Sequence, residues 1–264
     1  MTPEHVDQAV DAWYRAIDKF VKAQPRGAIE WGARGVHHIV SDTQLVILNG
    51  VFCADRQPDP ATVAAIAPAA AAAGLPWSIQ IRSETPPADI VDIAASYGLT
   101  NRIELPFMLK PLDASVADMG GEKLATVRVT SPEDSAAYVA ALAGGFGGPP
   151  EIFTPFGSPA VLGAPGFSGY LAEVEGVPVA TGLTVLDGEW VNIFNISTLP
   201  DHRRRGYGRA IMGKILSDAY AAGARHALLH SSSDGRHVYP GLGFRTAESW
   251  AVFVADKKAD TISP

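Results

Sequence analysis

A basic turn with two glycines carries the clearest chemical signal in the sequence. Residues 200–209 read Pro-Asp-His-Arg-Arg-Arg-Gly-Tyr-Gly-Arg, between an apolar run at 190–196 and an alanine- and leucine-rich run at 210–222. The first run predicts a strand and the second predicts a helix. A glycine-containing turn before a helix can present several backbone N–H groups to a phosphate, and four arginines add positive charge. The turn therefore predicts a polyphosphate ligand.

Two common classes of polyphosphate site do not fit this turn. A P-loop ends in Gly-Lys-Ser/Thr, which the turn lacks. A dinucleotide-binding fingerprint has a third glycine and an acidic residue at the end of the next strand. Here Ile211 stands at the third glycine position, and the next predicted strand ends at His230. The class that remains is the pyrophosphate of coenzyme A.

The composition excludes several other classes of protein. The 264 residues suffice for one large or two ordinary domains, and 47% hydrophobic with 19% charged residues is typical of a globular chain. A net charge of −7 argues against a nucleic-acid partner. The single cysteine, Cys53, allows no intramolecular disulfide and no cysteine-based zinc site. With no signal-peptide pattern and no apolar run of membrane-spanning length, we expect a cytoplasmic protein without a membrane partner.

The elements expected before the turn divide into two groups. In the first group strands alternate with helices, which favours an α/β domain over residues 1–115. Its predicted elements are a helix at 6–23, a strand at 45–52, a helix at 60–73, a strand at 77–82, a helix at 87–97 and a strand at 102–110. A small, polar stretch at 112–123 is the expected linker.

The second group forms an expected domain over residues 124–264. It begins with a strand at 124–129 and a helix opened by Ser131, with Asp134 at the capping-box position. A long glycine- and proline-rich loop, with room for a short helix, is expected over 144–169. A three-stranded meander follows, because alternating apolar runs are separated by Gly176 and by Asp187-Gly188. Two further strands are expected at 224–230 and 250–254, after the helix that follows the arginine turn.

Residues Arg203–Gly208 resemble the Arg/Gln-x-x-Gly-x-Gly/Ala signature of the GNAT superfamily of acyl-CoA-dependent N-acetyltransferases. Upstream, residues 198–200 read Thr-Leu-Pro, similar to the family's hydrophobic-x-Pro. Downstream, residues 239–244 read Tyr-Pro-Gly-Leu-Gly-Phe, similar to its late Leu-Tyr-x-x-x-Gly-Phe motif with Val238 for leucine. The resemblance covers about residues 124–255 and implies a mixed, largely antiparallel sheet flanked by helices.

The N-terminal half resembles the degenerate first half of tandem GNAT proteins in the order of its elements. It has no Arg-x-x-Gly-x-Gly of its own. The resemblance implies that this half does not bind CoA and instead forms a wall of the acceptor site.

The resemblance also implies acetyl-CoA as the acyl donor and no metal. A splayed strand pair is expected to admit the pantetheine, with backbone contacts from Ile196, Ser197 and Thr198. The pyrophosphate is expected to accept hydrogen bonds from backbone N–H groups in the turn. The cofactor-binding residues there are then Arg203, Arg204, Arg205, Gly206, Tyr207, Gly208 and Arg209. Ser232 stands where many relatives carry a CoA-contacting asparagine.

Tyr239 stands where family members commonly place the tyrosine that gives a proton to the leaving thiolate. A base for the amine is harder to find. Several relatives use a glutamate on the fourth or fifth strand, and the matching positions here are Asn192 and Ala227. Glu189 fits only with a shifted register. His202, His230 and a water-mediated route stay open.

The expected function is an N-acetyltransferase in which a substrate amine attacks acetyl-CoA directly. The alternative is a non-catalytic acyl-CoA-binding or regulatory module, which the missing strand carboxylate motivates. The expected partner is a small-molecule or peptide amine. An acyl group larger than acetyl and a homodimer are both left open.

Overall fold

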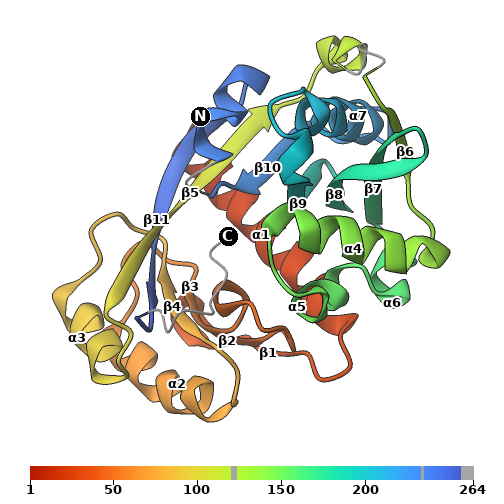
Figure 1. The fold of residues 1–264 in the computed structure, drawn as a ribbon. Helices are drawn as coiled ribbons and strands as arrows, with labels where there is room; N and C mark the ends of the chain where they lie inside the picture. The colour runs from red at the N-terminus through yellow and green to blue at the C-terminus, as the bar shows by residue number, and fades with distance from the viewer. Residues whose placement is uncertain (120–123, 233–234, 257–264) are drawn as a thin grey trace.

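The structure, a computed structural model, describes residues 1–119, 124–232 and 235–256. Within these residues the strands form one 11-stranded sheet in the order β1-β2-β3-β4-β11-β5-β10-β9-β8-β7-β6 (Figure 1). Only the pairs β3–β4 and β9–β10 are parallel, so the expected mixed, largely antiparallel sheet is confirmed. The strands are β1 (Ala28–Glu30), β2 (Val36–Val40), β3 (Gly50–Cys53), β4 (Ser78–Ile81), β5 (Asn101–Pro111), β6 (Thr126–Val129), β7 (Phe167–Val174), β8 (Val177–Asp187), β9 (Trp190–Thr198), β10 (His226–His230) and β11 (Arg245–Val254).

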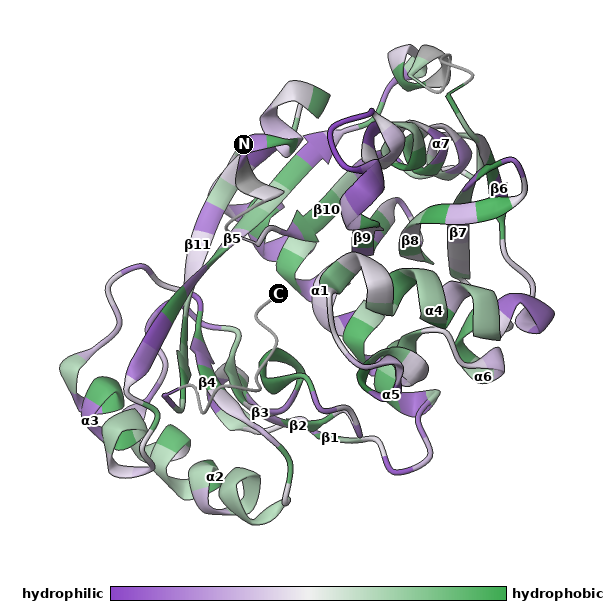
Figure 2. Cartoon of the chain, viewed as in Figure 1, coloured by the Kyte–Doolittle hydropathy of each residue, from purple (hydrophilic) through white to green (hydrophobic). Residues whose placement is uncertain are grey.

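The helices of the described residues pack into three hydrophobic cores. One core contains α2 and α3, a second contains α7, and the largest contains α1 with α4, α5 and α6. Figure 2 shows α2 in the green of hydrophobic residues, which reflects its alanine-rich sequence. No helix in these parts of the chain is both long and apolar enough to span a membrane. The helices are α1 (Pro3–Lys22), α2 (Pro60–Ala72), α3 (Ala88–Ser96), α4 (Ser135–Phe146), α5 (Pro150–Phe153), α6 (Pro159–Leu162) and α7 (Tyr207–Ala221).

The last strand of each half pairs within the other half. β5 lies between β10 and β11, where Leu109 stands opposite Leu228 on one side and Arg245 on the other. β11 in turn lies between β4 and β5, with Val252 opposite Gln80. The halves therefore cannot separate without breaking backbone hydrogen bonds on both sides of the exchanged strands. The boundary expected between residues 115 and 124 stays a prediction, and 120–123 lie outside the described residues.

Helix α1 packs against strands of both halves. Thr2 caps it by accepting a hydrogen bond from the His5 N–H, and its buried face spans the helix at the predicted spacing. Although α1 precedes the N-terminal strands in sequence, it also contacts β8 and β9. Arg15 and Lys19 pair with Asp187 at 2.6 and 2.7 Å. The helix therefore bridges the two halves at the centre of the molecule (Figure 1).

The prediction of a strand over residues 45–52 is wrong for the first half of that range. Val46–Leu48 form a 3₁₀ helix, and β3 begins only at Gly50. Asn49 explains the difference, because its buried amide donates to the carbonyls of Thr43, Leu45 and Pro76 while its oxygen accepts from the Ser41 N–H and hydroxyl. A side chain that satisfies so many local backbone groups competes with the strand ladder.

The loop expected over 144–169 contains α5, a 3₁₀ helix at Thr154–Phe156 and α6. The N-termini of α5 and α6 are set by a proline at the first position of each helix and, for α6, by the Ser158 cap. Each helix is one turn long, too short for its apolar spacing to stand out in the sequence. Their function in the fold is to place Phe153 and Phe156 in the largest core.

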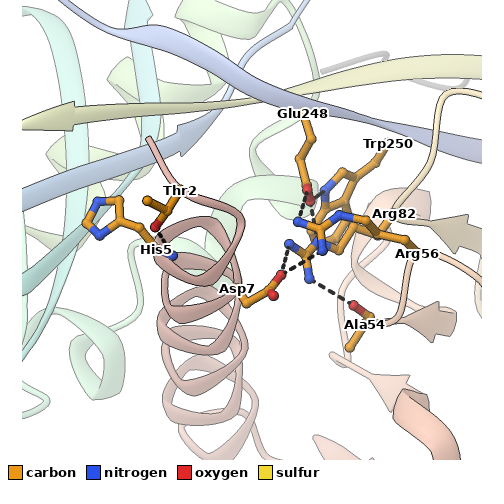
Figure 3. Close-up of polar contacts among 8 residues, drawn as sticks. All are labelled: Thr2, His5, Asp7, Ala54, Arg56, Arg82, Glu248 and Trp250. Carbon is orange, nitrogen blue, oxygen red and sulfur yellow. Dashed lines mark hydrogen bonds and ion pairs between the residues drawn. The ribbon is translucent and has the colours of Figure 1, made fainter.

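Arg82, directly after β4, lies at the centre of a charged network that joins three elements (Figure 3). Its guanidinium pairs with Asp7 of α1 and with Glu248 of β11. Arg56 pairs with the same two carboxylates at 3.0 and 3.3 Å. The Trp250 indole donates to Glu248 over 2.7 Å. The network thus ties the central helix to the exchanged strand.

The pKa of Asp7 shows how the charges balance. Burial by itself raises this pKa, but the hydrogen bond and charge of Arg82, together with Arg56, bring it below its ordinary value of 3.8. A lowered carboxyl pKa stabilises the fold above that value, and this contribution is lost as the pH falls through the native pKa. The Arg82 side chain is only 5% exposed, so its charge depends on these partners.

We expect Glu248→Gln to lower the free energy of unfolding by about 2 kcal/mol, because the nearly buried Arg82 then keeps only one full carboxylate partner. Urea denaturation measures the change. Glu104→Gln is the matched control, since Glu104 lies exposed on the neighbouring strand β5. Equal losses for the two variants would show that the network does not stabilise the exchanged strand.

Candidate functional site

The parallel strands β9 and β10 separate halfway along their length. They pair only over Trp190–Asn192 and His226–Leu228. Beyond that point β9 runs on to Thr198 beside β8, and β10 runs on to His230 beside β5. The splayed strand pair that the resemblance implied is therefore present. Backbone groups of β9 on the open side have no strand partner among the described residues, so they can hydrogen-bond an inserted ligand.

A β-bulge bends β9 at the point of separation. Residue pairing with β8 shifts between Thr181 and Leu183, and Asn195 takes a positive φ of 55°. Thr181 secures the bulge, because its hydroxyl donates to the Asn195 carbonyl and bonds the Ser197 hydroxyl at 2.8 Å. The Ser197 side chain is thereby occupied, which leaves its backbone for the ligand. A bulge turns side chains to new directions and often lies next to a functional site.

The arginine turn lies directly after β9. A Cβ at Gly208 would stand 3.5 Å from the Thr198 hydroxyl, so the first turn of α7 faces the end of the strand. Arg204 and Gly206 have positive φ angles of 59° and 91°. No acceptor within the described chain is found for the backbone N–H groups of residues 204–209. These N–H groups and the positive end of the α7 dipole form an anion-binding cradle.

The arginine side chains of the turn fall into two groups. Arg203 donates to the carbonyls of Thr198 and Gly145, at 3.2 and 2.8 Å, and so fastens the turn to the ends of β9 and α4. The others, Arg204, Arg205 and Arg209, are exposed and make no ion pair with any residue that the structure describes. They add positive potential around the cradle.

An apolar pocket of about 160 Å³ opens from the splayed strands. Of the residues expected in the site, Ile196, Ser232 and Tyr239 line it, whereas Ser197, Thr198 and the arginine turn do not. The candidate base His230 also lines it, and the N-terminal half, which was expected to form a wall of the acceptor site, contributes several residues. The sequence did not indicate which other residues form the walls. They come from α1, the 45–48 segment, β4 and β5 of the N-terminal half and from α4, α5, the 3₁₀ helix at 154–156 and β9, through Trp13, Leu45, Val46, Ile47, Leu48, Gln80, Leu105, Phe146, Phe153, Phe156, Ile193, Phe194 and Asn195.

Tyr239 lies at the start of a 3₁₀ helix, Tyr239–Leu242, with its ring against Phe244. It is 9% exposed, and burial raises its pKa to about 12. The phenol is therefore a neutral proton donor across the physiological range. Nearby, the Ser232 hydroxyl accepts from the Gly235 N–H. The Ser232 O–H can still donate a hydrogen bond to a ligand.

The candidate bases have very different environments. Burial among Trp13, Phe107 and Trp250 lowers the pKa of His230 to about 3, so this pocket histidine is neutral at pH 7. Neither ring nitrogen has a hydrogen-bond partner in the described residues. Glu189 lies exposed at the β8–β9 turn, the end of β9 away from the splay.

Other candidate positions do not supply a base to the pocket. Asn192 is buried and donates to the Ala12 carbonyl of α1. Ala227 is buried in the α7 core, and the His202 ring lies beside Tyr207 in the arginine turn. Among the residues that line the pocket there is no Asp or Glu. In addition, the described residues contain no group of His, Cys, Asp and Glu suited to a metal ion.

The N-terminal half has a matching parallel pair that stays closed. β3 and β4 pair along their full length, from Gly50–Ser78 to Cys53–Ile81. The turn that follows carries Pro58 and Pro60, which have no N–H to offer, and Asp59 puts a negative charge at the start of α2. This half therefore lacks both the opening and the anion cradle.

Comparison with known proteins agrees with this geometry. Residues 165–246 match the sequence model of the acetyltransferase (GNAT) domain. No curated protein matches the chain. A GCN5-related N-acetyltransferase from Kribbella flavida has a similar structure, with a TM-score of 0.65, 20% identity and 95% of both chains covered.

Two further solved structures share the fold at low sequence identity. A conserved protein of unknown function from Staphylococcus epidermidis gives a TM-score of 0.64 at 10% identity, over 90% of this chain and 98% of that one. A GNAT-family protein from Novosphingobium aromaticivorans gives 0.52 at 16% identity, over 86% and 91%. The N-terminal half is thus part of the shared fold. The chain carries a GNAT acetyltransferase domain in its C-terminal half, on a fold that GNAT proteins share over nearly its whole length.

Proposed function

We propose that the protein is an N-acetyltransferase that transfers the acetyl group of acetyl-CoA to a primary amine. The observation that carries the proposal is the combination of the splayed β9–β10 pair with a cradle of unpaired N–H groups at residues 204–209. A long ligand with a pyrophosphate at one end and a thioester at the other matches these two features. The cradle binds the pyrophosphate, and the splay admits the pantetheine beside Ile196, Ser197 and Thr198.

The reaction proceeds by direct attack in this proposal. The lone pair of a neutral amine attacks the thioester carbonyl carbon, and a β9 N–H freed by the splay stabilises the developing oxyanion. The carbon–sulfur bond then breaks, and the Tyr239 phenol gives its proton to the leaving thiolate. The proton lost by the amine restores the phenol through water. Products are the N-acetyl amine and free CoA thiol.

The apolar pocket offers a way to obtain the neutral amine without a carboxylate. Removing an ammonium group from water lowers its pKa, because the low-dielectric surroundings disfavour the charged form. The amine therefore loses a proton to water more easily as it enters. Neutral His230 and the Gln80 carbonyl oxygen can accept an N–H hydrogen bond there.

A non-catalytic acyl-CoA-binding module is the second candidate. One observation favours it, namely that no carboxylate of the described residues lines the pocket. Release of CoA thiol with a panel of amines separates the two candidates. Turnover with any amine supports the enzyme, whereas acetyl-CoA binding without turnover supports the module.

We expect acetyl-CoA to bind with a Kd between about 1 µM and 1 mM, measured by isothermal titration calorimetry. Gly206→Ala should weaken this binding by at least about tenfold, since a Cβ strains the left-handed backbone that shapes the cradle. The matched control is Gly223→Ala, at the other end of α7, where φ is 103° and a Cβ meets no atom. The cradle is supported if both variants lose similar stability but only Gly206→Ala loses affinity for acetyl-CoA. Equal acetyl-CoA affinities in the two variants contradict it.

We expect Tyr239→Phe to lower kcat by about 10²-fold or more, while acetyl-CoA affinity changes little, because only the proton transfer is lost. Since the pKa of Tyr239 is about 12, the wild-type rate should show no loss from phenol ionisation between pH 7 and 9. Steady-state kinetics with thiol detection measures both.

Tyr170→Phe is the control for that prediction. Tyr170 is also buried, but it lies on β7, outside the pocket. If Tyr239→Phe turns over as fast as Tyr170→Phe, the phenol has no role in the reaction.

A further inference from the structure

The pocket beside the splayed strands is lined without any charged side chain. None of the described residues that line it is Asp, Glu, Lys or Arg. Phe146, Phe153 and Phe156 form one wall from the C-terminal half, and Trp13 and Leu105 contribute from the N-terminal half. A fixed charge on a ligand would lose its hydration here without gaining a partner. The lining therefore selects against ligands with a second charge.

The wall formed by Leu45, Val46, Ile47 and Leu48 is apolar yet incompletely covered. All four side chains are only partly buried, although they pack on the largest core. Figure 2 shows the short helix beside β3 in the dark green of hydrophobic residues. When an apolar ligand covers the apolar side chains that face a pocket, the free energy falls, because apolar surface is removed from water.

This wall is held in place by buried hydrogen bonds. Asn49 donates to the Leu45 carbonyl at 3.1 Å, and the Gln80 amide donates to the Ile47 carbonyl at 2.6 Å. Both Asn49 and Gln80 are 1% exposed. The wall is therefore ordered before a ligand arrives, which reduces the entropy lost on binding.

Gln80 also leaves a neutral acceptor next to this wall. Its NH₂ group donates to the Ile47 carbonyl and to the Ser78 hydroxyl, which fixes the orientation of the amide. Its Oε1 is buried and has no hydrogen-bond partner among the described residues. A buried unpaired carbonyl oxygen favours a ligand that brings an N–H group. A neutral acceptor of this kind suits a neutral amine better than an ammonium ion.

We propose that the acceptor is a small primary amine on an apolar body, with no second charged group, and that the 45–48 wall selects it. This inference rests on the acetyltransferase activity proposed above. It excludes polyamines, aminoglycosides and lysine side chains within charged peptides as preferred acceptors.

The test compares two amines that differ only in their second amino group. Hexylamine should be acetylated with a kcat/KM at least about tenfold above that of hexane-1,6-diamine, because the diamine must bury a second ammonium. In the series from butylamine to hexylamine, each methylene should raise kcat/KM about fourfold. Equal rates for hexylamine and the diamine, or no rise with chain length, overturn the proposal.

A charge placed in the wall should weaken this selectivity. Val46→Glu is expected to lower the ratio of kcat/KM for hexylamine over the diamine by about tenfold, since the carboxylate pairs with the second ammonium. Val177→Glu makes the same change at the exposed start of β8 and should leave the ratio unaltered. Unchanged acetyl-CoA affinity, measured by calorimetry, would show that Val46→Glu is folded. An unaltered ratio in Val46→Glu counts against the wall.

The design separates this inference from the proposed function. If acetyl-CoA binds and the diamine or a lysine peptide is the better acceptor, only the inference fails. If acetyl-CoA does not bind, the proposed function fails, and direct calorimetric titration with hexylamine and the diamine still tests the pocket. Binding of the diamine as tight as that of hexylamine, or no binding of hexylamine, then rejects the inference as well.

Discussion

Two strands, β5 and β11, are exchanged between the two halves, and this exchange holds the molecule together as one sheet. Each of them pairs with strands of the other half on both of its edges, so the sheet is continuous through the centre. Such a continuous ladder holds β10 against β5, and β10 is one side of the splayed pair. The Arg82 network adds an ionic tie between α1 and β11 at the same place. The opening between β9 and β10 is therefore framed by rigid elements rather than by loops.

Each half contains a parallel strand pair with a turn and a helix between its strands, but the two pairs differ. In the C-terminal half, the bulge at Asn195 bends β9 away from β10 and the following turn presents free N–H groups. In the N-terminal half, β3 and β4 remain paired, and prolines and Asp59 occupy the corresponding turn. Charge and backbone geometry thus give the two halves different capacities. One can hold an anionic cofactor, and the other supplies apolar walls for the pocket.

In the proposed reaction, the handling of protons follows from the absence of charged side chains among the described residues that line the pocket. A carboxylate base would need hydrogen-bond partners when buried, and the lining residues offer few. The polar groups present are neutral at pH 7, namely Tyr239, His230, Gln80, Asn195 and Ser232. A site of this kind disfavours the ammonium form of its substrate instead of extracting the proton with a strong base. The same property that discourages a second charge on the acceptor also promotes the reactive form of the amine.

Local features of the site could be predicted from the sequence. The glycines and arginines of residues 203–209 predicted the turn before α7 and a polyphosphate ligand, because hydrophobic periodicity and turn chemistry are encoded by neighbouring residues. The sheet class, acetyl-CoA as the expected ligand and the role of Tyr239 came from the resemblance of residues 203–208 and 239–244 to the GNAT motifs. The sequence predicted a strand where Val46–Leu48 form a 3₁₀ helix, because it did not show that Asn49 is buried against nearby backbone groups. Within the loop expected over 144–169 it indicated at most one short helix, whereas the structure has two one-turn α-helices and a 3₁₀ helix there. Nor did the sequence reveal the strand exchange or the role of Gln80. Both depend on which distant segments of the chain lie side by side in the folded protein. A pocket wall is made by residues that are far apart in the sequence and share no local pattern, so the folded arrangement is needed to identify it.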